Sequence, residues 1–159
     1  MINLLASIRY LSLIEGDIKG RVTMGYKCQT WKNSLIDAQN GFVKLGSHCS
    51  VNRNSILFGE GGLTIGDYVR IAQNVLIYSS THNFKRTDVP ISQQGNIKRP
   101  TIIKDDVWIG AGVIILAGSK IGKGCVIGAG CLINGTIQDY SIVIGERSLY
   151  LSGRYGGRK

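Results

Sequence analysis

The stretch from Ile103 to Ile133 reads IKDDVWIGAGVIILAGSKIGKGCVIGAGCLI, and isoleucine returns in it at every sixth position. A period of six fits neither an α-helix, which repeats near 3.6 residues, nor an ordinary strand, which alternates with a period of two. It fits a short strand that buries one aliphatic side chain and is followed by a corner. The positions of this repeat are Ile103, Ile109, Ile115, Ile121, Ile127 and Ile133.

Two other positions of the repeat support a corner. The third residue after the aliphatic is Asn54, Asn74, Asp106, Gly112, Gly118, Gly124 or Gly130, and these residue types tolerate positive φ. The fourth is small or β-branched, as a second inward position requires, and it includes Cys125 and Cys131, which we predict to be core residues. Three such sides close a triangular coil, and stacked coils form parallel sheets with strands about 4.8 Å apart.

The repeat extends toward the N-terminus and is interrupted once. Aliphatic residues keep the period at Ile65, Ile71 and Ile77. They also keep it at Leu45, Val51 and Leu57, and these two runs are offset from each other by a two-residue slip at Leu63–Thr64. We predict one domain over 1–159, with a capping segment at 1–16, a β-helix over 18–145 and a basic tail at 146–159. The interruption, about 82–100, reads HNFKRTDVPISQQGNIKRP. A loop this long leaving a compact repeat is usually functional.

Composition excludes several classes of protein. The chain has 159 residues, 43% of them hydrophobic, with 22 glycines and 2 prolines, so neither a disordered nor a collagen-like protein is expected. The net charge of +9 is scattered, without a helix-turn-helix or an aromatic-studded basic stripe, and we expect no nucleic-acid partner. The four cysteines form no C-x-x-C pair and there are two histidines, which predicts no metal site and a reducing cytoplasm.

The N-terminal residues 2–14 are apolar but interrupted by Arg9, and they are too short to span a membrane. Their helical spacing predicts a short helix, which either caps the core or rests on a membrane surface. We therefore expect a cytoplasmic protein, with peripheral contact at the inner face of the cell membrane as the alternative to a simple cap.

The repeat together with THNF, VPISQQG, IKRP and VWIGAG resembles the hexapeptide-repeat acyltransferases, nearest to the sugar and polysaccharide O-acetyltransferases. The resemblance covers roughly residues 43–145. It implies an all-β fold, the left-handed parallel β-helix, and a homotrimer with active sites between neighbouring copies. It also implies acetyl-CoA as acyl donor, a carbohydrate as acceptor, and no metal.

The same resemblance implies roles for particular residues. His82, at the start of the long loop, matches the catalytic histidine, and neutral imidazole is a suitable base for a sugar hydroxyl. His48 falls at a corner and is interpreted as structural. Asn52, Asn54 and Trp108 are implied acceptor ligands. The implied cofactor ligands are Trp108, Ala111, Ala129, Asn134, Arg147 and Arg154, where the two arginines replace a basic residue that relatives carry elsewhere.

The resulting hypothesis is an acetyl-CoA-dependent O-acetyltransferase that acts on a sugar hydroxyl of a surface polysaccharide or its precursor, with a histidine as general base. One alternative keeps the fold and acylates an amino sugar, although the chain has no G-x-G-x-x-G nucleotide-binding segment. The other alternative is a non-catalytic β-helix that serves as an assembly module.

Overall fold

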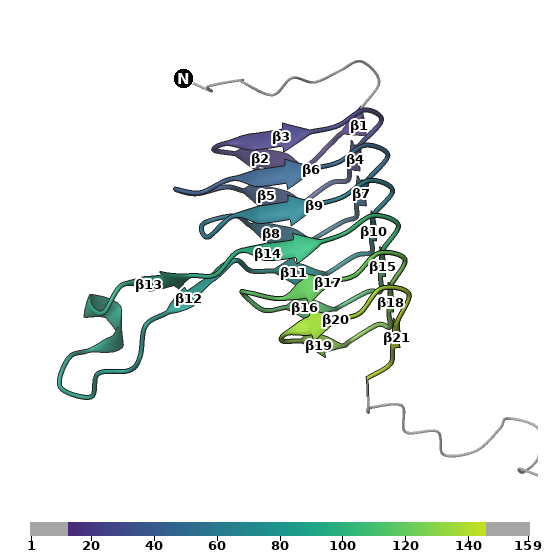
Figure 1. Cartoon of the computed structure of the whole chain (residues 1–159). Coiled ribbons are helices and arrows are strands. Elements are labelled where there is room, and N and C mark those ends of the chain that lie inside the picture. The colour runs from purple at the N-terminus through teal and green to yellow at the C-terminus, as the bar shows by residue number, and fades with distance from the viewer. Residues whose placement is uncertain (1–12, 146–159) are drawn as a thin grey trace, which may run out of the picture.

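Three parallel sheets form the sides of a triangular coil in the computed structural model, which describes residues 13–145 (Figure 1). Sheet A contains β1 (Leu13–Ile14), β4 (Gln29–Thr30), β7 (Ser50–Val51), β10 (Arg70–Ile71), β15 (Trp108–Ile109), β18 (Val126–Ile127) and β21 (Ile142–Val143). Sheet B contains β2 (Asp17–Lys19), β5 (Leu35–Asp37), β8 (Ile56–Phe58), β11 (Leu76–Ile77), β16 (Ile114–Ile115) and β19 (Leu132–Ile133). Sheet C contains β3 (Val22–Met24), β6 (Val43–Leu45), β9 (Leu63–Ile65), β14 (Thr101–Ile103), β17 (Lys120–Ile121) and β20 (Thr136–Ile137).

The coil is left-handed, as the resemblance implied. In Figure 1 the chain crosses sheet C at the front from left to right, passes sheet A at the right and returns behind along sheet B while it descends. The one long excursion is also confirmed. It is an arm, residues 80–99, whose strands β12 (Ser80–His82) and β13 (Asn96–Lys98) pair antiparallel and carry the 3₁₀ turn η1 (Ile91–Gln93) at the far end.

The six-residue repeat builds the core as predicted. The aliphatic position is buried in every repeat from Leu45 to Ile133. The small or β-branched residue four positions later is buried beside it in most repeats, Cys125 and Cys131 included, but not after Leu57 or Ile77, where the coil widens or the arm begins. The corner residues predicted to have positive φ all have it, from Asn54 at 59° to Gly130 at 72°. Each side of the coil is therefore a short strand whose direction is reset by one left-handed residue.

The coil begins earlier than the sequence indicated. Strand β1 already pairs with β4 in register, so Leu13 and Ile14 belong to sheet A rather than to a cap ending at residue 16. In the next strand of sheet A, the inward position of the repeat is held by Thr30. This residue is buried, and its hydroxyl accepts a hydrogen bond from the Gly16 amide at 3.2 Å. A polar residue at the aliphatic position hid this rung from a search for aliphatic side chains. The predicted N-terminal helix lies outside the described residues.

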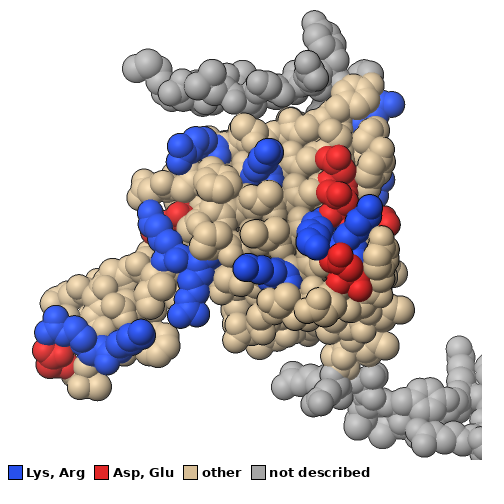
Figure 2. Space-filling model, viewed as in Figure 1, with Lys and Arg blue, Asp and Glu red and all other residues tan. Residues whose placement is uncertain are grey.

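The outer faces of sheets B and C differ in chemistry. Successive strands of sheet B place an aliphatic ladder on the outside, formed in register by Leu35, Ile56, Leu76, Ile114 and Leu132. Sheet C instead presents Thr23, Lys44, Thr64, Ile102, Lys120 and Thr136. Figure 2, which looks onto sheet C, shows lysine and arginine side chains over this face and along the arm. Within residues 13–145, no helix is long and apolar enough to cross a bilayer.

Candidate active site

The corner between sheets B and C carries the irregular segments of the coil. It is widened at 38–42 and 59–62, it holds the arm in the following turn, and it passes through 116–119 below the arm. Because these segments stack on one another, the departures from the repeat gather along one edge of the prism. The two-residue slip noted in the sequence at Leu63–Thr64 is the consequence of the second widened corner.

The base of the arm is anchored in the coil by buried hydroxyls. The Ser79 hydroxyl donates to the Phe58 carbonyl at 2.8 Å and accepts from the Gly61 amide at 2.9 Å. The Thr101 hydroxyl donates to the Tyr78 carbonyl at 2.7 Å. A Cβ built on Gly61 would overlap the Ser79 carbonyl oxygen, so only glycine lets the corner approach the arm this closely. The point at which the arm leaves the coil is therefore fixed.

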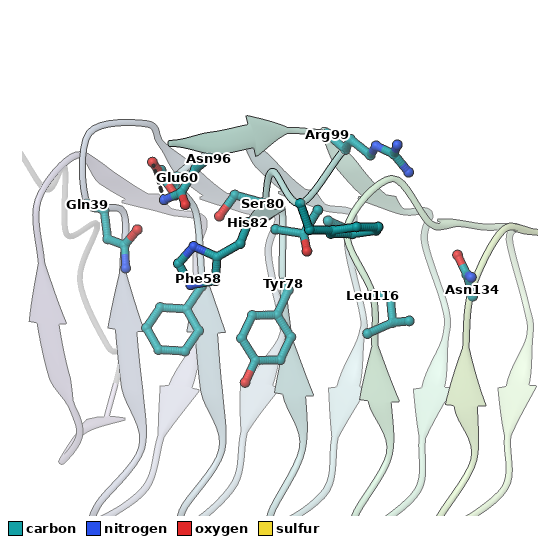
Figure 3. Close-up of a pocket in the computed structure, with 13 residues that line it drawn as sticks. Gln39, Phe58, Glu60, Tyr78, Ser80, His82, Asn96, Arg99, Leu116 and Asn134 are labelled. Carbon is teal, nitrogen blue, oxygen red and sulfur yellow. Dashed lines mark hydrogen bonds between the residues drawn. The ribbon is translucent and has the colours of Figure 1, made fainter. Parts of the chain in front are cut away.

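A groove of about 700 Å³ runs along this edge beside the arm (Figure 3). Its residues come from the widened corners, the outer face of sheet B and the arm. They are Gln39, Phe58, Glu60, Tyr78, Ser80, Thr81, His82, Phe84, Asn96, Arg99, Leu116, Ala117 and Asn134. The floor is largely apolar, with the Phe58 and Tyr78 rings stacked at 5.4 Å between centroids. Apolar lining with a few convergent polar groups is typical of a small-molecule site.

His82 is the histidine of this groove. It ends β12, and its exposed side chain extends over the floor, beside Phe58 and near Glu60 and Asn96 (Figure 3). Glu60, the one carboxylate among the lining residues, accepts from Asn96 Nδ2 at 3.0 and 3.3 Å through its two oxygens. Arg99 is the one cation among them. A base, a carboxylate, a guanidinium and an apolar floor therefore share one groove.

The other histidine has a different environment. His48 sits at the corner between sheets C and A with φ of 59°, and its ring stacks on Tyr68 at 4.8 Å and meets the edge of Tyr26 at 5.7 Å. Its place at a corner is the one predicted from the repeat.

The residues implied as ligands do not gather at one place on the single chain. Asn134 lines the groove with His82. Trp108 lies on the outer face of sheet A with 57% of its surface exposed, which confirms that it points outward. The other four lie at the corner between sheets A and B, on the opposite edge of sheet B from the groove: Asn52, Asn54, Ala111 and Ala129. Arg147 and Arg154 lie outside the described residues.

Sequence reasoning missed Glu60, Asn96, Arg99, Phe58 and Tyr78 as groove residues. Phe58 and Tyr78 follow the inward aliphatic by one position, so the period alone places them outside. Asn96 and Arg99 lie in the loop that was singled out, but only the hairpin pairing shows that they stand near His82. No cluster of potential metal ligands occurs among residues 13–145.

Comparisons with known proteins agree with this architecture. Residues 100–135 match the family model described as bacterial transferase hexapeptide (six repeats). A probable acetyltransferase of Mycobacterium tuberculosis is 34% identical over 121 residues, 76% of this chain and 40% of that protein. A galactoside O-acetyltransferase of Lactococcus lactis is 36% identical over 103 residues, 65% of this chain and 49% of that protein.

A solved structure of a related protein also agrees with this architecture. The hexapeptide-repeat acetyltransferase of Vibrio cholerae, complexed with acetyl coenzyme A, is 27% identical with a TM-score of 0.66, over 74% of this chain and 63% of that one. These matches confirm the resemblance to hexapeptide-repeat acyltransferases. The chain spans about half the length, or less, of the two curated relatives described above.

Proposed function

We propose that this chain is an acetyl-CoA-dependent O-acetyltransferase that acylates a sugar hydroxyl of a surface polysaccharide or its precursor, with His82 as the general base. The observation that carries the proposal is the placement of His82 in a groove, at the end of strand β12 of the arm. Named acetyltransferases among the relatives, one of them a galactoside O-acetyltransferase, support the reaction and the carbohydrate acceptor.

The reaction needs a proton acceptor because a sugar hydroxyl is barely ionised at neutral pH. In the proposed step the neutral His82 imidazole takes the hydroxyl proton while the oxygen attacks the thioester carbonyl carbon. The tetrahedral intermediate then expels the coenzyme A thiolate, and the imidazolium returns its proton to the departing sulfur. The stacked Phe58 and Tyr78 rings supply an apolar surface on which the face of a sugar can pack.

The acyl donor is proposed from the Vibrio cholerae relative, whose structure contains acetyl coenzyme A. Asn134 lines the groove two turns beyond the arm and is proposed to contact the donor. Ala111 and Ala129, at the other edge of sheet B, and Trp108, on the outer face of sheet A, remain proposed donor contacts. Asn52, Asn54 and Trp108 remain proposed acceptor contacts. Arg147 and Arg154 remain proposed partners for the phosphates of the donor.

A homotrimer is part of the proposal, and the aliphatic ladder of sheet B supports it. Apolar surface of this kind on a soluble β-sheet usually marks an interface. If three copies close around their B sheets, the edge between A and B of one copy meets the edge between B and C of the next. That contact would bring Asn52, Trp108 and Ala111 of one copy beside the groove of another, although they are on separate surfaces in one chain.

The test is an acceptor screen with acetyl-CoA that follows the release of free thiol and the mass of the product. Matched acceptors, a neutral sugar and its amino-sugar analogue, distinguish the two acylation chemistries, because an ester is cleaved by mild base and an amide is not. We expect thiol release that depends on a hydroxyl acceptor. An amide product would establish the amino-sugar alternative, and no thiol release with any acceptor would favour the non-catalytic assembly module.

A further inference from the structure

One hydrogen-bonded bridge joins the side chains of the arm to those of the coil. Asn96 Nδ2, on strand β13 of the arm, donates to Glu60 Oε2 at 3.0 Å and to Oε1 at 3.3 Å. Glu60 belongs to the widened corner 59–62 and is half-buried. Among residues 13–145, this is the one side chain to side chain hydrogen bond between the arm and the coil. A bond to an ionised carboxylate is stronger than one between neutral groups.

The bridge ends next to the proposed base. Asn96 is the residue directly opposite His82 in the antiparallel pair β12–β13. Side chains directly opposite each other on antiparallel strands lie on the same face of the pair, with Cβ atoms about 5 Å apart. Figure 3 shows Glu60, Asn96 and His82 together at one end of the groove. A shift of Asn96 relative to the coil therefore moves the strand pair that carries His82.

The other hydrogen bonds of the arm do not set the position of Asn96 relative to the coil. The Arg99 amide donates to the Ser79 carbonyl at 2.8 Å, and the Arg99 carbonyl accepts from the Gly118 amide at 3.1 Å. These two bonds hold the arm where it leaves the coil. Further out, the Asn83 amide bonds to the Gly95 carbonyl at 2.9 Å, and the Gln94 side chain bonds to Arg86 and Val89, all within the arm. These outer contacts keep the arm intact, but none of them joins the arm to the coil. The Glu60–Asn96 bridge is placed to set that angle.

We propose that Glu60 and Asn96 are a pair of positioning residues that hold the arm against the coil and so place the His82 imidazole over the groove. The inference rests on the proposed function for its consequence in catalysis, but not for its consequence in the motion of the arm. Misplacement of a catalytic group by about 1 Å can cost on the order of 10²-fold in rate. Loss of the bridge should therefore lower kcat and leave the KM for acetyl-CoA near its normal value.

The decisive experiment reverses the polarity of the bridge. Asn96→Asp places two carboxylates face to face, and we expect kcat to fall by about 10- to 10²-fold. Glu60→Gln keeps the shape and weakens the bond. In the double variant, the glutamine amide at position 60 can donate to the aspartate at position 96, and kcat should recover to within a few-fold of the Glu60→Gln value. Gln93→Glu, which adds the same charge to η1 away from the bridge, is the control and should change little.

Amide hydrogen exchange at Gly118, whose amide donates to the Arg99 carbonyl of the arm at 3.1 Å, and the pH profile of kcat complete the test. We expect faster exchange in Asn96→Asp, slower exchange again in the double variant, and an unshifted pH profile in both. The proposal is overturned if the double variant is no more active than Asn96→Asp, which would mean that repulsion from Glu60 is not the cause of the loss. It is also overturned if the exchange at Gly118 is the same in the wild type, the two single variants and the double variant. If the wild-type protein shows no transferase activity, but exchange still rises when the bridge is broken and falls when it is restored, the proposed function is refuted and the positioning role of the bridge is retained.

Discussion

The coil and the arm use residues in different ways. In the coil, a residue is described almost completely by its position in the six-residue repeat, so that Ile109, Ile115 and Ile121 are interchangeable in role. In the arm, no position is equivalent to another: Gln94 and Asn96 make different hydrogen bonds, and His82 lines the groove. The difference teaches that the repeat supplies stability and a straight edge, whereas departures from it at one corner supply the groove. Substitutions in the two regions should therefore fail in different measurements.

The largest effect on stability is expected in the core of the coil. Ile109 is fully buried between turns, and Ile109→Ala should lower the free energy of unfolding by about 2–5 kcal/mol. Phe84→Ala removes a larger side chain from the arm, where it is 67% exposed, and should change stability by no more than about 0.5 kcal/mol. Chemical denaturation of both variants measures the difference. Equal losses would mean that the arm and the coil unfold as one packed unit.

The next effect concerns assembly and compares two faces of the coil in one turn. Leu76→Asp puts a charge on the aliphatic ladder of sheet B, and we expect it to convert trimers to monomers at micromolar concentration. Ile102→Asp puts the same charge on the outer face of sheet C in that turn and should leave the trimer intact. Light scattering coupled to size exclusion reports the masses. A wild-type monomer, or a trimer unaffected by Leu76→Asp, would contradict the proposed interface.

A smaller effect is expected where φ is positive. Asn74 occupies a coil corner at φ of 57°, and Asn74→Ala should cost about 1 kcal/mol because alanine tolerates this conformation poorly. Gly95 in the arm has φ of 72°, so Gly95→Ala introduces similar strain. We expect the first variant to lower Tm with kcat retained and the second to lower kcat with Tm retained. If Asn74→Ala instead lowered kcat and Gly95→Ala lowered Tm, the distinction between coil and arm would be wrong.

The smallest effect comes from exposed charge pairs. Lys104 Nζ lies 2.9 Å from Asp139 Oδ1, and this hydrogen bond, with another from the Lys123 amide, holds the pKa of Asp139 below its ordinary value. A carboxyl whose pKa is lowered on folding stabilises the protein above the pKa of the unfolded chain, about 4, and loses that contribution as the pH falls. Asp139→Asn should lower Tm slightly at pH 7, with the difference disappearing in acid.

The arm provides the matched pair for this prediction. Arg86 pairs with Asp88 near the far end of the arm and lowers the pKa of Asp88 in the same direction. Asp88→Asn should leave Tm unchanged at either pH, because the tip contributes little to the cooperative unfolding of the coil. A Tm that responds equally to both substitutions would show that the arm shares in the stability of the coil.

The sequence predicted the structural features that depend on the six-residue repeat, but it did not predict the contacts that lie outside the repeat. The inward isoleucines, the positive-φ corners and the outward Trp108 follow from the period, because each depends only on position within a turn. The rung at Thr30 was missed because a buried hydroxyl replaces the aliphatic side chain there. Glu60 was missed because its role depends on a hydrogen bond to Asn96 across 36 positions of chain, and no local pattern encodes such a contact. The split of implied ligands over two edges of sheet B likewise appears only in three dimensions.

The central claim, that chemistry resides in the arm and stability in the coil, is tested most directly by the two histidines, one in each region. The measurement is thioester cleavage at saturating acceptor by purified His82→Ala and His48→Ala, with Tm and trimer mass recorded for both. The account predicts that His82→Ala loses about 10²- to 10⁴-fold in kcat with Tm unchanged, and that His48→Ala keeps its kcat. Wild-type turnover by His82→Ala would contradict the account.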